Sequence, residues 1–285
     1  MNLKKNNLLQ IFKSSPRSST KWSNYFDIYE EIFKKYKDKK ITLVEIGIGD
    51  GGSLHMWKKY FKKDSRIIGI EMNPDAKKLE SDGFEIFIGD QSSKNFWKKF
   101  YKKIGKIDIL LDDGGHRNIQ QITSLVESIN YINDRGMIVI EDTHSSYMKK
   151  GGFGNPSKYS FINFCTILIE NIHRRNPMVK KINNKFSDKI HSLCFYDSVA
   201  TINVSSQIVK KTHNLVNKKN EPVFFVDYRN RGYFIKTISL YKKIFGNLDE
   251  NTLIFKILRK TFHRNIFFYI HEKLKLKRYF NDYKK

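Results

Sequence analysis

Short apolar runs recur along the first half of the chain, at residues 41–48, 66–71, 84–89, 107–111 and 136–140. Each run has the length of a β-strand and is almost continuously apolar, which is typical of parallel strands covered on both faces. Segments of helical character separate the runs, at residues 54–61, 93–103 and 118–132. Strands that alternate with helices are joined by right-handed crossovers, so the pattern predicts a Rossmann-like, doubly wound α/β sheet.

Later segments extend this sheet. Residues 159–174 have a helical pattern, and residues 192–196 and 198–204 are expected to form two strands with Asp197 at the turn. The additions complete a seven-stranded, mostly parallel sheet with helices on both faces, in a domain of residues 1–205. Residues 149–156 are rich in Gly and Lys, and we interpret them as a loop suited to a substrate lid.

The C-terminal residues 206–285 differ in composition, with 19 Lys and Arg against 6 Asp and Glu. A helical pattern runs through residues 249–280. We expect a basic, largely helical extension that packs on the domain or on a second copy of the chain, and the second arrangement would make a homo-oligomer. Binding to a membrane surface is the weaker alternative.

The formal net charge of +24 has three explanations: an anionic partner, a membrane surface or a Lys-rich coding bias. Lys outnumbers Arg, whereas specific nucleic-acid contacts favour Arg, so we expect no specific nucleic-acid partner. Coding bias together with a small anionic substrate is the favoured interpretation. No run is apolar enough to span a bilayer and no secretory pattern opens the chain, so a cytoplasmic location is expected.

Acids and glycines follow the predicted strands. Ligands of doubly wound sheets bind beyond the carboxyl ends of the strands, and carboxylates gathered at one edge without a ligand would repel each other. The sequence therefore predicts a site built from the residues at these ends: Glu45, Gly47, Gly49, Ser53, Glu71, Asp90, Gln91, Asp112, Asp113, His116, Glu141, Asp142 and His144.

The loop after the first strand is predicted to bind an adenosine-containing cofactor. Its spacing of Gly47, Gly49 and Gly52, with Glu71 to bind a ribose, fits either NAD or S-adenosylmethionine. Glu45 and the Asp90-Gln91 pair favour S-adenosylmethionine, because carboxylates would repel a pyrophosphate but not a sulfonium or an amino group.

These residues resemble the motifs of class I S-adenosylmethionine-dependent methyltransferases. The resemblance implies that Glu45, Gly47, Gly49 and Ser53 line the methionine end of the cofactor, that Glu71 binds the ribose, and that Asp90 and Gln91 bind the adenine. Asp112, at the end of the fourth strand, is assigned to the same cofactor site.

The acids after strands four and five predict the chemistry. Methyl transfer to an alcohol requires its proton to leave, which a divalent cation or a general base promotes. Asp113, Glu141 and Asp142 offer the hard oxygen ligands that suit Mg²⁺, and a histidine is the usual base.

This set is similar to the metal-dependent sugar O-methyltransferases of macrolide tailoring and to the cephalosporin hydroxylase-like family. The resemblance covers residues 18–204 and includes Tyr25 and Tyr29 in a substrate-side helix. It departs at Gly115, where Ser is usual. It implies that Asp113 and Asp142 bind a metal, with Glu141 a weaker candidate, and that His116 is the catalytic base beside Asp113. His144 receives no role from it.

The sequence thus predicts an O-methyltransferase that acts on a sugar hydroxyl, of a nucleotide-linked or otherwise phosphorylated sugar or a surface-polysaccharide precursor. A phosphate-type or other small anionic acceptor is one alternative. A nucleic-acid methyltransferase is another, although the chain lacks the Pro-Pro pair of amino-group methyltransferases after strand four. A catalytically inactive scaffold is the least favoured.

Overall fold

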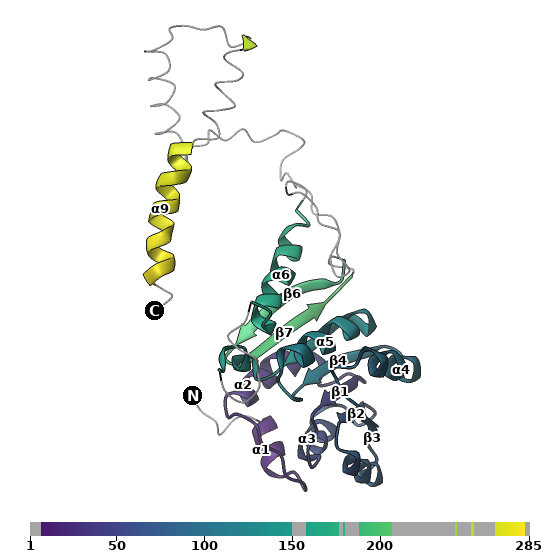
Figure 1. The fold of residues 1–285 in the computed structure, drawn as a ribbon. Coiled ribbons are helices and arrows are strands. Elements are labelled where there is room, and N and C mark those ends of the chain that lie inside the picture. Colours follow the sequence, from purple (N-terminus) through teal and green to yellow (C-terminus); the bar gives the residue numbers. More distant parts are fainter. Residues whose placement is uncertain are drawn as a thin grey trace, which may run out of the picture. The chain divides into compact units, whose positions relative to one another are not determined.

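The computed structural model describes residues 7–149, 158–176, 179, 188–206, 243, 252–253 and 266–282. The chain divides into two compact units, residues 1–213 and 214–285, and each is described by itself. The first unit contains a seven-stranded sheet with helices on both sides (Figure 1).

The sheet has the strand order β3-β2-β1-β4-β5-β7-β6. The first five strands are parallel, whereas β7 runs antiparallel to both of its neighbours, β5 and β6. The predicted seven-stranded, mostly parallel sheet is therefore confirmed. The strands are β1 (Thr42–Ile46), β2 (Arg66–Glu71), β3 (Glu85–Ile88), β4 (Ile107–Asp112), β5 (Ile132–Ile140), β6 (Ile190–Tyr196) and β7 (Val199–Val204).

Two buried clusters lie on opposite faces of the sheet. One joins the sheet to α1 (Asn7–Lys13), α2 (Tyr25–Phe33) and α3 (Gly52–Tyr60). The other joins it to α4 (Lys94–Ile104), α5 (Asn118–Ser128) and α6 (Phe161–His173). Short 3-10 turns, Lys34–Tyr36, Pro74–Asp82, Ile129–Tyr131 and Thr143–Tyr147, connect these elements.

The alternation of side chains along the central strands decides which acids can meet. Leu43, Leu111 and Val139 belong to the cluster of α1 to α3, whereas the residues one position away belong to the other cluster. Side chains two positions apart share a face. Glu45, Asp113 and Glu141 therefore fall on the side of α1 to α3, and Asp112 falls on the side of α4 to α6.

The fifth strand begins earlier than the sequence predicts. The expected helix over residues 118–132 ends at Ser128, and β5 starts at Ile132. The start of the strand is polar and its pairing with β4 is irregular, because Ile107 pairs with Ile132 and Ile109 with Met137. This interruption removes the continuous apolar run by which the other strands are recognised.

The structure describes two of the predicted segments only in part. Of the predicted lid, residues 150–156 lie outside the described residues, and so does most of the extension from residue 206. Within that extension the structure describes α9, Ile266–Asp282. None of the helices in the described ranges is long and apolar enough to cross a membrane.

Candidate active site

The glycine loop between β1 and α3 contains two glycines with different surroundings. Gly47 has a φ of +79°, and a Cβ there would overlap the backbone of Asp113 and Gly114. Gly49 has a φ of +51°, and a Cβ there would meet nothing within 4 Å. Both conformations favour glycine. Gly47 thus lets the β1 and β4 loops touch, while Gly49 faces open space.

Glu71, at the end of β2, ties this loop to its neighbour. Its Oε2 accepts the Gly49 N–H at 3.3 Å. Its Oε1 accepts the N–H groups of Met72 at 2.8 Å and Asn73 at 3.2 Å. The partly exposed carboxylate therefore lies beside the open space at Gly49.

Glu45 and Ser53 lie beneath the loop. Both are buried, and the Ser53 hydroxyl donates to Glu45 Oε2 at 2.8 Å. Burial raises the pKa of the Glu45 carboxyl. Glu45 therefore contacts the start of α3 through Ser53. Any effect of Glu45 on the methionine end of a cofactor would be indirect, through the position of the glycine loop.

The acids beyond β3 and β4 divide between surface and interior. Asp90 is partly exposed and accepts the backbone N–H of Ser92 at 2.8 Å. Gln91 is buried: its amide donates to both oxygens of Asp112 at 2.9 Å and accepts the Gly115 N–H at 3.0 Å. Burial raises the pKa of Asp112. Gln91 and Asp112 therefore link two loops internally, and Asp90 alone of the three faces the edge of the sheet.

Lys21, which the sequence analysis did not single out, lies at the centre of the carboxylates on the other face. Its ammonium is 2.6 Å from Asp113 Oδ2, 3.1 Å from Glu141 Oε2 and 3.4 Å from Glu45 Oε1. Its side chain is 1% exposed. One ammonium thus connects the ends of β1, β4 and β5, as the alternation along these strands allows.

Glu141 belongs to this buried network. It accepts bonds from Lys21 on both oxygens and from the Tyr29 hydroxyl on Oε1. Burial raises the pKa of Glu141 well above its usual range, against the opposing effect of the Lys21 charge. Glu141 is completely buried, and both of its oxygens already accept hydrogen bonds. A metal ligand would need a free oxygen, which Glu141 does not offer in this arrangement.

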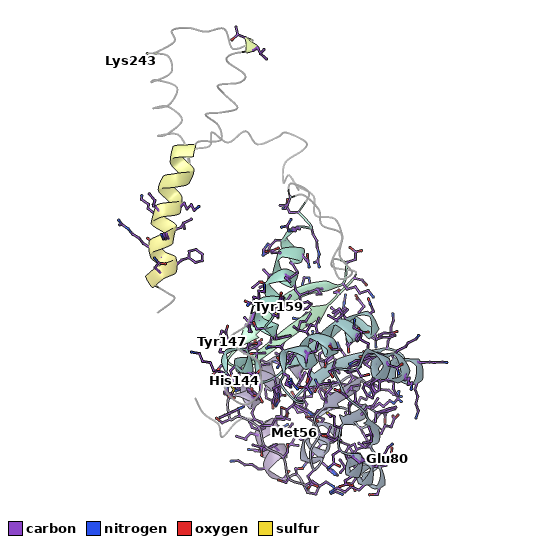
Figure 2. The ribbon with its side chains drawn as sticks, in the orientation of Figure 1. Met56, Glu80, His144, Tyr147, Tyr159 and Lys243 are labelled. Atoms are coloured by element: carbon purple, nitrogen blue, oxygen red, sulfur yellow. The ribbon has the colours of Figure 1, made fainter. Side chains whose placement is uncertain are left out.

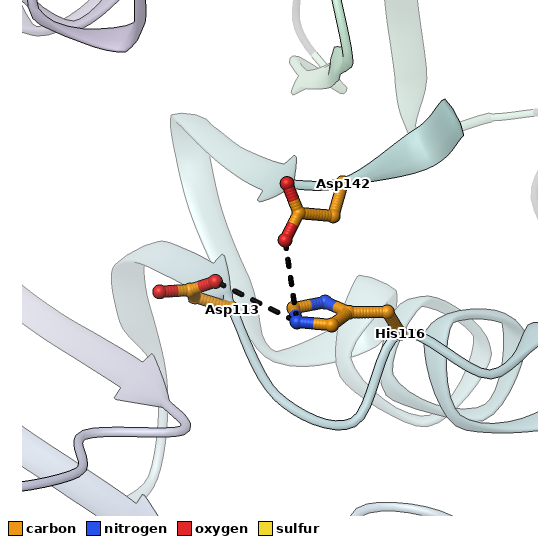
Figure 3. A group of neighbouring side chains, drawn as sticks. All are labelled: Asp113, His116 and Asp142. Atoms are coloured by element: carbon orange, nitrogen blue, oxygen red, sulfur yellow. Dashed lines mark ion pairs between the residues drawn. The ribbon is translucent and has the colours of Figure 1, made fainter. Parts of the chain in front are cut away.

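Asp113, His116 and Asp142 gather at the edge of the sheet (Figure 3). His116 Nε2 lies 3.3 Å from Asp142 Oδ2 and 4.0 Å from Asp113 Oδ1. His116 and Asp142 have φ values of +54° and +52°, a backbone region that costs about 1–3 kcal/mol for residues other than glycine. Such strain collects at functional sites, so the observation supports a functional role for the cluster.

Protein partners orient both carboxylates of this cluster. Asp113 contacts Lys21 through Oδ2, and Asp142 Oδ1 accepts the Tyr25 hydroxyl at 2.6 Å. Each therefore has a second oxygen directed toward His116. The ligand atoms of the three residues lie within 4.8 Å of one another, a spacing at which they could hold a metal ion. The two carboxylate oxygens that face His116 fit the preference of Mg²⁺ for oxygen donors.

His144 lies beside this cluster. Its Nδ1 is 3.9 Å from Asp142 Oδ1, and the side chain is 41% exposed. Its ring makes a perpendicular contact with the Trp22 ring, with centroids 6.2 Å apart.

Comparisons with known proteins give one consistent result. No family model matches the chain. It is 30% identical over 166 residues to an 8-demethyl-8-alpha-L-rhamnosyl tetracenomycin-C 2'-O-methyltransferase of Streptomyces olivaceus, a match covering 54% of this chain and 43% of the relative. It is also 30% identical over 149 residues to an L-olivosyl-oleandolide 3-O-methyltransferase of Streptomyces antibioticus, covering 49% and 38%. The chain thus spans less than half the length of these relatives.

A solved structure has the same fold. The MycE methyltransferase of the mycinamycin pathway, solved with Mg and SAH, superposes with a TM-score of 0.60 at 24% identity, over 70% of this chain and 54% of MycE. The structure therefore has the Rossmann-like fold of class I S-adenosylmethionine-dependent methyltransferases. The predicted resemblance is confirmed, since the relatives are O-methyltransferases named for sugar-bearing natural products.

Proposed function

We propose that this chain is an S-adenosylmethionine-dependent O-methyltransferase that methylates a hydroxyl of a sugar unit in a small molecule. The observation that carries the proposal is the direct packing of Gly47, in the cofactor loop, against Asp113 of the Asp113–His116–Asp142 cluster. A methyl donor held by this loop would therefore adjoin a base and two free carboxylate oxygens. The relatives named for sugar O-methylation support the choice of acceptor.

The start of α3 supports S-adenosylmethionine over NAD. In dinucleotide-binding folds the pyrophosphate lies at the N-terminus of this helix. Here the Gly52 N–H donates to the Ser18 carbonyl oxygen at 3.2 Å. A Cβ on Gly52 would also contact the carbonyl oxygen of Arg17, so carbonyl oxygens cover the place where an anion would sit.

S-Adenosylhomocysteine is expected to raise the melting temperature, and NAD is not. A ligand present at 100 times its Kd stabilises the folded state by about 2.7 kcal/mol. Gly49→Val should abolish the shift, because the side chain would fill the open space beside Glu71. Gly105→Val is the matched control, since Gly105 has a φ of +76° and equally open surroundings at the end of α4. A shift with NAD alone would contradict the assignment.

The cluster can carry out the reaction in one displacement. The acceptor oxygen attacks the sulfonium methyl carbon, the carbon–sulfur bond breaks, and the hydroxyl proton passes to His116 Nε2. Asp113 and Asp142 would hold Mg²⁺ through the oxygens that Lys21 and Tyr25 leave free, and His116 remains the base. When bound, the cation would polarise the acceptor hydroxyl and ease loss of its proton. Glu141, already occupied by Lys21 and Tyr29, is left out of the proposed ligands.

The charge of the site favours a neutral glycoside as the acceptor. Glu45, Asp113 and Glu141 surround one ammonium, that of Lys21, and Asp142 accepts the Tyr25 hydroxyl nearby. An anionic group close to the cluster would therefore meet four carboxyl groups and a single ammonium. A nucleotide-linked sugar or a polysaccharide precursor is the second candidate, favoured by the overall charge of +24.

Activity is expected to vanish in EDTA and to return with Mg²⁺. The assay compares simple glycosides, such as methyl rhamnoside, with nucleotide-linked sugars, and follows methyl transfer from labelled S-adenosylmethionine. Turnover of neutral glycosides above nucleotide sugars would support the first acceptor class, and the reverse order would support the second. Full activity in EDTA would remove the metal from the proposal and leave His116 acting alone as base.

A further inference from the structure

Trp22 is a large aromatic side chain held at the surface next to the cluster. It is 60% exposed, whereas the other two tryptophans, Trp57 and Trp97, are 0% and 1% exposed. Its backbone is fixed on both sides. Lys21 is anchored on three carboxylates, and the Trp22 carbonyl accepts the Tyr25 N–H at 3.1 Å. A fixed, exposed indole beside a candidate active site is a typical binding element.

One contact of the indole and one contact of the preceding residue place Trp22 near the cluster. Lys21, the preceding residue, is 2.6 Å from Asp113. The His144 ring, which contacts the indole at an interplanar angle of 86°, lies 3.9 Å from Asp142. The Trp22 and His144 rings are thus nearly perpendicular to each other. Tyr147, on the same turn as His144, is 65% exposed (Figure 2).

We infer that Trp22, with His144, forms a stacking subsite for the C–H face of a neutral sugar ring, whose hydroxyl is thereby presented to the Asp113–His116–Asp142 cluster. The inference rests on the proposed function and names the group that determines acceptor specificity. The face of an aromatic ring is negative, and it attracts the weakly positive C–H groups of a sugar. Loss of this contact weakens acceptor binding without touching the atoms that react.

Tryptophan fluorescence tests the inference directly, because only one of the three indoles is accessible. Acrylamide should quench Trp22 selectively, since Trp57 and Trp97 are buried. In the presence of Mg²⁺ and S-adenosylhomocysteine, methyl α-rhamnoside is expected to lower the quenching constant roughly twofold by covering one of the two indole faces. Protection by rhamnose 1-phosphate but not by the methyl glycoside would overturn the neutral-sugar assignment. Absence of protection by either would overturn the subsite.

Kinetics of matched variants complete the test. Trp22→Leu should raise the KM for the glycoside about tenfold with little change in kcat, the upper range for one aromatic contact, and Trp22→Phe should restore most of the affinity. Ile167→Ala, at a residue 51% exposed on α6, should leave KM unchanged. An unchanged KM in Trp22→Leu would refute the subsite while leaving the proposed function standing. Failure of the wild-type protein to bind S-adenosylhomocysteine would instead refute the proposed function.

Discussion

Replacing His116 by Asn is expected to slow methyl transfer by roughly 10²- to 10⁴-fold, the range for loss of a general base. The reason is the position of Nε2, which faces one carboxylate oxygen of Asp113 and one of Asp142. Asn is the preferred replacement because it tolerates the left-handed backbone that His116 adopts at a φ of +54°. Single-turnover rates with bound S-adenosylmethionine measure the chemical step.

Binding measurements on the same variant separate a base from a ligand. S-Adenosylhomocysteine and Mg²⁺ should bind His116→Asn as they bind the wild-type protein, because the cofactor loop and both carboxylates remain. Asp142→Asn is the matched variant, and it should lose Mg²⁺ affinity while keeping the cofactor. If His116→Asn also lost Mg²⁺, the imidazole would be a metal ligand and the proton would have to leave by another group.

The sheet could be predicted because each of its buried strands has a signal within its own short stretch of sequence. Parallel strands buried on both faces need continuous apolar runs, and five of them stand out in the sequence. The start of β5 was missed for the same reason. Asn133, Asp134 and Arg135 interrupt the run, and the bulged pairing with β4 that tolerates them depends on a neighbouring strand. The start of this strand is therefore a tertiary feature with no local pattern.

The candidate site was predictable only in part, for a related reason. The acids at the strand ends were visible because chain topology alone brings those ends together. The sequence could not indicate which acids stay exposed. Asp142 keeps an oxygen directed toward His116, whereas the neighbouring Glu141 is buried beneath Lys21 and Tyr29. Lys21 itself precedes the sheet and is one of 53 basic residues, so no spacing distinguished it.

Replacing Lys21 by Met is expected to destabilise the domain by about 3–5 kcal/mol, the range for removing one partner of a buried ion pair. Glu45 and Glu141 are completely buried, and without the ammonium their charges would have no compensation. Lys77→Met is the control. Lys77 lies 2.6 Å from Glu80, as close as Lys21 lies to Asp113, but both partners are about half exposed, so water screens the pair and its loss should change stability far less.

The pH dependence of this loss identifies its cause. Burial raises the pKa of Glu45 and of Glu141, and the positive charge of Lys21 opposes that effect. Both pKa values should therefore rise further in Lys21→Met. A carboxyl whose folded pKa is raised contributes stability at low pH and loses it as the pH rises through that pKa. The difference in stability between wild type and Lys21→Met should accordingly shrink on acidification.

A second substitution tests the same cause at neutral pH. Adding Glu141→Gln to Lys21→Met removes one buried charge and should recover part of the lost stability. If neither acidification nor Glu141→Gln relieved the loss, Lys21 would act through packing alone.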